Sequence, residues 1–250
     1  MNDAFAVTGA AGVLLALWER AAGVAPADRD DALLAAAAAE GDPPTSLGAR
    51  NAALMGLRSR LFGRVQPLRC NCPHCGAVSE FPIDCDALAQ ALQPASEAAR
   101  MHQMEAAGWR VEFRLPNATD VRVVSEHARD EEEFVLALLQ RCVSRCERDD
   151  GATCAPQELP AAVAEALSRR MEALEGGASV SFELHCPECA LSWAAFMDVG
   201  AVLWSELQSR AERLLLDVDV LARAYGWSEA QVLALSPTRR AAYLQLVGAG

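Results

Sequence analysis

Two stretches of this 250-residue chain repeat one pattern: Cys72-Pro-His-Cys75-Gly-Ala-Val-Ser-Glu-Phe81-Pro-Ile-Asp84 and Cys186-Pro-Glu-Cys189-Ala-Leu-Ser-Trp-Ala-Ala-Phe196-Met-Asp198. Each runs from a Cys-Pro-x-Cys turn into a strand-like segment that ends at an Asp. Two residues between cysteines let a tight turn present both thiolates to one ion, and Zn²⁺ prefers four such ligands in a tetrahedron. We therefore predict one structural zinc per chain, bound by Cys72, Cys75, Cys186 and Cys189.

The two cysteine pairs lie far apart in the chain, because 110 residues (76–185) separate Cys75 from Cys186. Contiguous zinc ribbons close over far shorter loops. The intervening residues must therefore form a folded insertion whose two ends return to the same place. Closing such a long loop adds little cost, since loop entropy rises only logarithmically with length. The sequence predicts a zinc ribbon that is split by an insertion.

The Cys-Pro-His-Cys turn is also a motif of thiol oxidoreductases, in which a helix N-terminus lowers the pKa of the first thiol. Here Gly76 and a β-prone segment follow Cys75, and the same turn recurs at Cys186 with Glu in place of His. This context favours metal binding over redox catalysis. Two free thiol pairs, or another soft metal, remain alternatives to zinc.

The other cysteines and two histidines have plainer interpretations. We expect Cys70 to be an incidental strand residue, although it lies close enough in sequence to compete as a ligand. The remaining candidates for a second site are Cys142 and Cys146, at i, i+4 spacing, together with Cys154. Buried structural thiols are the favoured interpretation, because free Cys packs like a small hydrophobe. The histidines beside the turns, His74 and His185, are expected at the turn surface or behind the ligands.

Composition places the chain among globular proteins that are not secreted. A hydrophobic content of 52% can fill a core. The 22 Lys and Arg against 34 Asp and Glu give a net charge of −12, which repels phosphate backbones, so no nucleic-acid partner is expected. The apolar stretch 4–18 lacks the basic start of a signal peptide and is too short to span a bilayer. Nine cysteines without an export signal indicate metal binding in a reducing cytoplasm, with no membrane partner.

The chain divides into three predicted regions. Residues 1–69 are expected to form a helical N-terminal region. Residues 70–198 form the split zinc-ribbon core, with an inserted α/β module at about 86–180, and residues 199–250 form a C-terminal helical hairpin region. The fold class is accordingly α+β, mainly helical with a small antiparallel β core formed by two distant Cys-Pro-x-Cys turns.

Local patterns fill in these regions. An Ala-rich run at 31–40 is expected to be helical. Trp109–Leu115 alternates as a half-buried strand, and Asp120–Val124 is predicted to return as its hairpin partner. The acidic residues from Asp130 suit the first turn of a helix that runs to Cys142. Near the C-terminus, a long amphipathic helix is expected to stop at Gly226 and to be followed by two short helices.

Motifs of the common enzyme classes are absent from the sequence. It contains no P-loop, no Gly-x-Gly-x-x-Gly, no His-Glu-x-x-His and no Gly-x-Ser-x-Gly. Four sulfur ligands also leave no open position on a zinc ion for water or substrate. We therefore expect a non-enzymatic protein without a small-molecule substrate.

Further stretches complete a pattern that resembles a known family. Leu57-Arg-Ser-Arg60-Leu-Phe-Gly63 precedes the first turn, Phe113-Arg-Leu-Pro116 lies between the turns, and Trp193 follows the second. The chain then ends with Leu221-Ala-Arg-Ala-Tyr-Gly-Trp-Ser-Glu229, Leu233-Ala-Leu-Ser236 and Arg239-Arg240-Ala-Ala-Tyr243-Leu. Together these stretches resemble the T4-type bacteriophage baseplate protein family, whose cellular relatives are encoded with phage-tail-like contractile injection systems. The likeness begins at about Leu57 and does not include the first 50 residues.

The resemblance implies a structural or assembly role. The protein would be part of the baseplate, or a chaperone-like factor that helps to build its hub and is absent from the finished particle. Its partners would be other baseplate or tail-assembly proteins, met in the cytoplasm or in a virion-like particle. Alternative functions are a zinc-ribbon adaptor of nucleic-acid or transcription machinery and a thiol oxidoreductase.

Five residues of the C-terminal region are candidates for partner binding. They are of types that are enriched at interaction hot spots: Tyr225, Trp227, Arg239, Arg240 and Tyr243. Tyr and Trp serve equally well to hold a helical hairpin against its own core, so both roles remain open for the aromatic residues.

Overall fold

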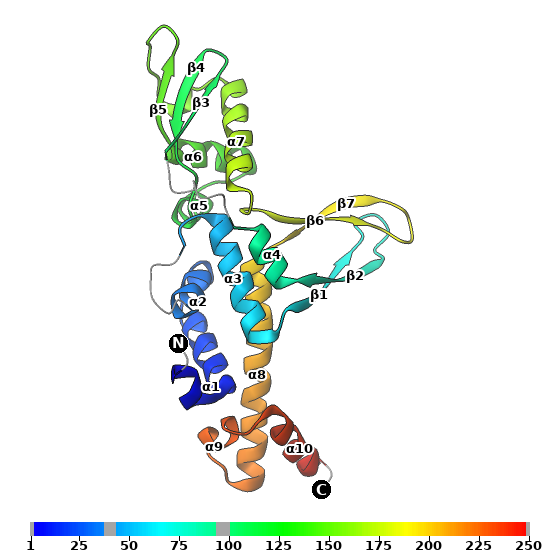
Figure 1. Ribbon diagram of the computed structural model, residues 1–250. Coiled ribbons are helices and arrows are strands. Elements are labelled where there is room, and N and C mark those ends of the chain that lie inside the picture. The colour runs from blue at the N-terminus through cyan, green and yellow to red at the C-terminus, as the bar shows by residue number, and fades with distance from the viewer. Residues whose placement is uncertain (1–2, 38–43, 94–100, 249–250) are drawn as a thin grey trace. The chain divides into compact units, whose positions relative to one another are not determined.

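The computed structural model describes residues 3–37, 44–93 and 101–248, which form two compact units (Figure 1). One unit joins the two ends of the chain, Met1–Asp42 and Val199–Gly250, and the other comprises Pro43–Asp198. The predicted α+β class, helical with small antiparallel sheets, is confirmed. The predicted division into three regions stays a prediction.

The first unit is built from helices in its described residues. They are α1 (Asp3–Ala22), α2 (Arg29–Ala37), α8 (Val199–Tyr225), α9 (Glu229–Leu233) and α10 (Pro237–Gly248), with a 3₁₀ turn at Pro26–Asp28. Leu15 of α1 is buried against Ala211 and Leu214 of α8. The helix predicted at 31–40 is confirmed as far as Ala37, and its remainder lies outside the described residues. No helix in the described ranges has both the length and the apolar run needed to cross a bilayer.

The turns between the last three helices are fixed by side-chain caps. The Ser228 hydroxyl accepts the Gln231 amide at 3.4 Å, and the Gln231 side chain accepts the Ser228 amide at 2.9 Å. This reciprocal capping box starts α9. At α10, the Ser236 hydroxyl accepts the Arg239 amide at 3.3 Å. The predicted stop of the long helix before Gly226 and the two short helices after it are therefore confirmed.

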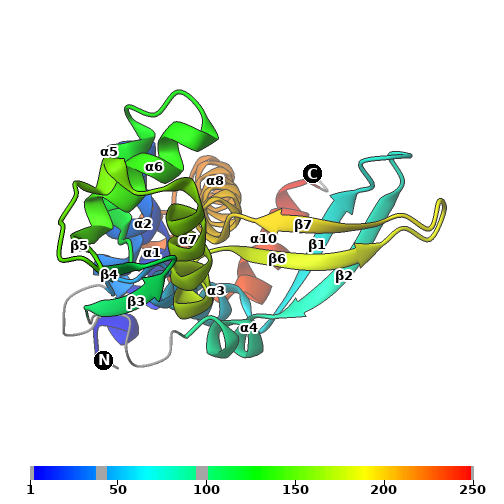
Figure 2. The ribbon, with the colours of Figure 1, turned by 90° about the horizontal axis from the view of Figure 1, so that it is seen from above.

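The second unit contains two β-hairpins that are distant in sequence. Helix α3 (Leu47–Phe62) leads into β1 (Val65–Asn71) and β2 (Val78–Asp84), which α4 (Cys85–Ala91) follows. The other hairpin is β6 (Val180–His185) with β7 (Ser192–Met197). Each hairpin is a separate two-stranded antiparallel sheet, and the two lie side by side in both views (Figures 1 and 2). We call these two hairpins together the ribbon.

An inserted module lies between the hairpins in the sequence. It consists of β3 (His102–Ala106), β4 (Trp109–Phe113), α5 (Ala118–Ser125), α6 (Glu131–Cys142), β5 (Val143–Arg148), a 3₁₀ turn at Pro156–Glu158 and α7 (Ala161–Glu175). Its sheet has the order β3-β4-β5 and is antiparallel throughout. The sheet and helices enclose a core of their own that includes Val111, Phe113, Leu139, Val163 and Leu167. The module therefore does not depend on the ribbon for its hydrophobic core.

The predicted strand at Asp120–Val124 is wrong. These residues lie in α5, and β4 pairs with β3 and β5 instead. The Asn117 side chain accepts the Asp120 amide at 3.0 Å, while the Asp120 carboxylate accepts the Asn117 amide at 3.1 Å. This capping box starts a helix where the alternation of side chains indicated a strand.

Asp120 also anchors a buried ion-pair network. Its side chain is only 2% exposed, and it accepts hydrogen bonds from Arg114 at 2.5 and 2.9 Å and from Arg141 at 3.0 Å. Burial raises the pKa of Asp120, but the hydrogen bonds from Arg114, the Asn117 amide and Arg141 outweigh that effect and lower it. The network ties the residues after β4 to the start of α5 and the end of α6.

Three chain segments cross closely at the base of the inserted module. A Cβ on Gly177 would lie 2.5 Å from the Leu92 carbonyl oxygen, and one on Gly48 would lie 2.9 Å from the same atom. Beside them the buried Glu175 side chain accepts the Gly48 amide at 2.7 Å, and Asn51 donates to the Gly177 carbonyl at 2.9 Å. We call this the glycine crossing. It joins the first turn of α3, the end of α4 and the end of α7.

Candidate metal centre

The two Cys-Pro-x-Cys turns have matching backbone hydrogen bonds. The Cys72 amide donates to the Ala77 carbonyl at 2.8 Å, and the Cys186 amide donates to the Leu191 carbonyl at 2.9 Å. A second bond closes each turn onto the carbonyl of its first cysteine, from Gly76 at 2.9 Å and from Ala190 at 3.0 Å. The sequence repeat is therefore a structural repeat.

The residue after the second cysteine has positive φ in both turns. Gly76 has φ 75°, and Ala190 has φ 59°. Glycine adopts this conformation freely, whereas alanine pays a steric cost of about 1 kcal/mol or more. The second turn takes the same shape in spite of Ala190, and its two backbone hydrogen bonds match those of the first turn.

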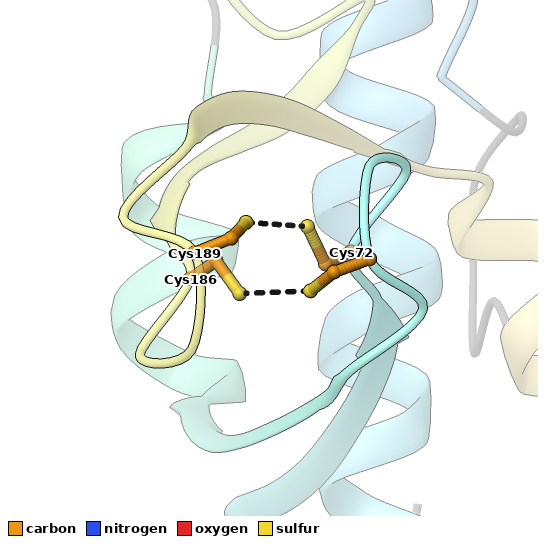
Figure 3. Close-up of side chains that lie close together, drawn as sticks. Cys72, Cys186 and Cys189 are labelled. Atoms are coloured by element: carbon orange, nitrogen blue, oxygen red, sulfur yellow. Dashed lines mark hydrogen bonds between the residues drawn. The ribbon is translucent and has the colours of Figure 1, made fainter.

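The four predicted ligand sulfurs lie together at the end of the ribbon (Figure 3). The Sγ atoms of Cys72 and Cys189 are 3.7 Å apart, and those of Cys75 and Cys186 are 3.6 Å apart. All four lie within 4.8 Å of one another. The fold thus brings together two pairs that are more than 100 residues apart in the chain.

This arrangement fits a tetrahedral metal ion. Zinc binds thiolate sulfur at about 2.3 Å, which places the sulfurs of a regular tetrahedron about 3.8 Å apart. The two measured cross-pair distances, 3.6 and 3.7 Å, are close to that value. Cys72 and Cys186 are buried, while Cys75 is exposed and Cys189 is half-buried. The four cysteines can therefore hold one metal ion at the end of the ribbon.

The thiols also differ in how readily they ionise. The Cys75 amide lowers the pKa of Cys72 to about 6, against the opposing effect of burial. The Leu191 amide favours the Cys189 thiolate, but burial and the neighbouring thiols outweigh it and raise the pKa of Cys189 to about 12. Four thiolates this close together repel one another, and a bound dication is the charge that lets all of them ionise.

The structure also bears on the thiol oxidoreductase alternative. The chain after Cys75 turns directly into β2, so Cys72 does not stand at a helix N-terminus. His74 is exposed on the turn, and His185 contacts the Ser192 hydroxyl at 3.1 Å. Within the part of the chain that the structure describes, the turn therefore lacks the helix N-terminus that lowers the pKa of the first thiol in such an enzyme.

Aromatic residues join the two hairpins behind the cysteines. Burial alternates along all four strands, so each hairpin has one half-buried face and one exposed face. Phe81 of β2 meets Phe182 of β6 on the half-buried faces, edge to face at 5.6 Å. Sequence reasoning missed this contact. The alternation along 78–84 and 180–185 marks both residues as inward-facing but does not show that they face each other.

The other cysteines do not form a second centre in the described residues. Among those residues, the four ribbon cysteines are the only group of three or more metal-binding side chains that lie close together. Cys70 lies on β1 outside that group. Burial raises the pKa of both Cys142 and Cys146 to about 11, as is typical of inert packed thiols. Cys154 donates its amide to the Cys146 carbonyl at 3.3 Å.

The candidate partner-binding residues of the first unit lie mostly against one another. Trp227 stacks on Tyr225 at 4.8 Å and meets Tyr243 edge to face at 4.9 Å. Arg240 is buried and pairs with Asp217 of α8 at 3.0 Å. Arg239 is exposed, and Tyr225 is 40% exposed. The aromatic residues thus hold α9 and α10 against the end of α8, and their role in partner binding stays a prediction.

Comparison with known proteins assigns the chain to a family. The family model described as T4 bacteriophage base plate protein matches residues 31–192, which is more than half of the chain. The match includes both cysteine turns and begins earlier than the resemblance at Leu57 indicated, but it stops before the C-terminal stretches that contributed to that resemblance. No curated protein and no solved structure gives a significant match. The chain belongs to the T4 bacteriophage base plate protein family.

Proposed function

We propose that this protein is a non-enzymatic structural or assembly component of the baseplate of a phage-tail-like contractile particle, stabilised by one structural zinc. The observation that supports this most strongly is the extent of the family match. Residues 31–192 include α3, the whole inserted module and all four ribbon cysteines. The candidate metal centre therefore lies within the region that matches the family model. We infer that it stabilises the part of the protein that acts in the baseplate.

Zinc in this proposal acts on folding and not on a substrate. Isolated two-stranded hairpins are marginally stable in water. The ribbon contains two of them, and within the described ranges the strands of each hairpin pair only with each other. Four sulfur ligands fill the coordination sphere of zinc, and the free energy of binding at such a closed site contributes to folding. One ion would hold the β1–β2 turn against the β6–β7 turn and present the ribbon as a rigid arm.

The C-terminal helices are the proposed partner-binding part of the first unit. Trp227 and Tyr243 are committed to packing α9 and α10, while Arg239 and the exposed side of Tyr225 remain available to a partner. Arg and Tyr are residue types enriched at interaction hot spots. The net charge of −12 opposes the nucleic-acid adaptor alternative, because that role needs a basic surface.

A deletion experiment tests the proposed function. Deleting the coding sequence from its host should leave particles that lack complete baseplates in electron micrographs, and the wild-type chain should restore them. Cys189→Ser should fail to restore baseplates, whereas the matched control Cys70→Ser, which alters a strand cysteine outside the metal centre, should succeed. Normal, contracting particles without the chain would refute a baseplate role.

Mass spectrometry of the purified particles distinguishes a structural component of the baseplate from an assembly factor. A structural component is present in them at a fixed ratio to the other baseplate proteins. An assembly factor is required for their formation and is absent from them.

A further inference from the structure

The backbone of the second hairpin offers one strand edge to a partner. The Cys186 amide and the Leu191 carbonyl point into the hairpin, because they bond to each other at 2.9 Å. Inward and outward backbone groups alternate along an antiparallel strand. The register then directs the amides and carbonyls of Ser192, Ala194 and Phe196 outward, away from β6. Among the described residues, β6 is the sole strand partner of β7.

Three of the four ribbon edges carry residues that discourage strand pairing. The same alternation directs Pro67 of β1 and Pro82 of β2 outward, where each lacks the amide that an added strand would need. The pair Arg69 and Glu80 places a charge on each of these edges as well. On β6, the outward position opposite Ala194 is Glu183. Prolines and charges at edges are the devices by which proteins prevent edge-to-edge association.

The fourth edge, that of β7, carries no such residue. Its six residues, Ser192-Trp-Ala-Ala-Phe-Met197, include neither proline nor a charged side chain. Phe196 is 76% exposed, the highest value among the large hydrophobic side chains described. An uncharged edge beside an exposed aromatic side chain is a template for β-strand addition.

The sequence of β7 is complementary to itself in an antiparallel arrangement. With Ala194 on a two-fold axis, Ala194 of each copy faces the other, and Phe196 faces Ser192 of the second copy. Trp193 then faces Ala195 of the second copy on the other side of the sheet. Phe196 and Trp193 each meet a small residue, and outward backbone groups meet outward backbone groups. Three pairs with outward backbone groups form across the two-fold axis, namely Ala194 with Ala194 and Phe196 with Ser192 in each direction, and they provide about six backbone hydrogen bonds, two for each pair.

We propose that two copies of this protein associate through β7, joining their second hairpins into a four-stranded antiparallel sheet with the order β6-β7-β7-β6. The self-complementary order of β7 favours a second copy in particular, and the strand adds no charge to the mutual repulsion of two chains with a net charge of −12 each. This inference rests on the hairpin register and is independent of the proposed baseplate function. The interface is small, so the dimer forms in a concentration-dependent way.

Sedimentation velocity of the full chain tests the proposal, from micromolar to millimolar concentrations. The wild type should shift from monomer to dimer as the concentration rises. Ala194→Pro should remain monomeric, because it removes an outward amide without removing a hydrogen bond of the hairpin. The matched control is Glu183→Pro, which removes the directly opposite outward amide on the other edge and should dimerise like the wild type. A monomeric wild type, or an Ala194→Pro variant that still dimerises, overturns the proposal.

Amide exchange of the wild type gives a second measurement that needs no variant. The amides of Ser192, Ala194 and Phe196 should exchange more slowly as the concentration rises, whereas those of Trp193 and Ala195, already bonded to β6, should not change. Equal exchange at all concentrations overturns the proposal. Protection that arises only when other baseplate proteins are added would assign the edge to a different partner and also overturn it.

Discussion

Replacing Cys189 by serine should separate the two hairpins of the ribbon from each other while leaving the inserted module folded. The contacts that hold the two hairpins together without a metal are modest. The Phe81–Phe182 edge contact at 5.6 Å contributes about 0.5–1.5 kcal/mol beyond its area. A structural zinc with four thiolates contributes about 10–16 kcal/mol at neutral pH. The metal is therefore the larger contribution by roughly tenfold, and the aromatic contact cannot replace it.

The inserted module should survive this change, because its core is separate. Val111, Phe113 and Leu167 are fully buried among side chains of the module itself. Hydrogen exchange with mass spectrometry should show faster exchange in peptides that cover 65–84 and 180–197. Peptides that cover 102–113 and 161–175 should keep their protection. Native mass spectrometry should show one metal ion per chain in the wild type and none in the variant.

Cys70→Ser is the control, since Cys70 lies on β1 two residues before Cys72 and outside the sulfur cluster. It should keep the metal and the protection of the ribbon. The reasoning is refuted if Cys189→Ser retains one metal ion with wild-type protection of both hairpins. It is equally refuted if the wild type protects its ribbon fully after complete removal of metal by a chelator.

Three further predictions concern the second unit. Gly48→Ala should lower stability by about 1–3 kcal/mol, because its Cβ would lie 2.9 Å from the Leu92 carbonyl oxygen. In the same helix Gly56→Ala, with only a flexible arginine side chain 3.6 Å away, should stabilise slightly, and thermal unfolding compares the two. Burial raises the pKa of Glu175, so its carboxyl favours folding at low pH and loses that contribution as pH rises through the folded pKa. Glu175→Gln should therefore increase the free energy of urea unfolding at pH 7, with the gain shrinking toward about pH 4; a gain that grows on acidification would contradict this. The pKa of Asp120 is lowered, so its carboxylate stabilises above about pH 4 and loses that effect as pH falls through the folded pKa. Asp120→Asn should cost about 2 kcal/mol at pH 7 and less in acid, and an equal cost at both pH values would show that the ion pairs contribute nothing.

The sequence predicted the cluster of four cysteine sulfurs because cysteine spacing is local chemistry, while the bound zinc stays a prediction. Two cysteines separated by two residues form half of a tetrahedral site wherever they occur, so two such pairs predicted one centre without knowledge of the insertion. The error at Asp120–Val124 has the opposite cause. The alternation of Asp, Val, Arg, Val and Val indicated a strand, but the capping box with Asn117 and the ion pairs to Arg114 and Arg141 favour a helix. All three partners lie outside Asp120–Val124, so that segment alone could not reveal the helix.

Contacts between distant segments had no signal in the sequence. Gly48 and Gly177 look like ordinary glycines of a helix and a loop, and their close approach to Leu92 depends on how three segments meet. Phe81 is one of several inward-facing side chains on β2, and Phe182 is one of several on β6, so neither strand pattern shows that these two meet.

The glycine crossing makes the inserted module separable from the ribbon. Leu92 and Gly177 stand in contact at the two ends of the intervening chain, so a cut there leaves a gap of a few ångströms. A short linker in place of residues 93–176 would span it and leave β1–β2 and β6–β7 with their cysteines in a much smaller protein. The same junction would allow the module to be enlarged, reduced or exchanged for another while the ribbon and its four cysteines keep their geometry.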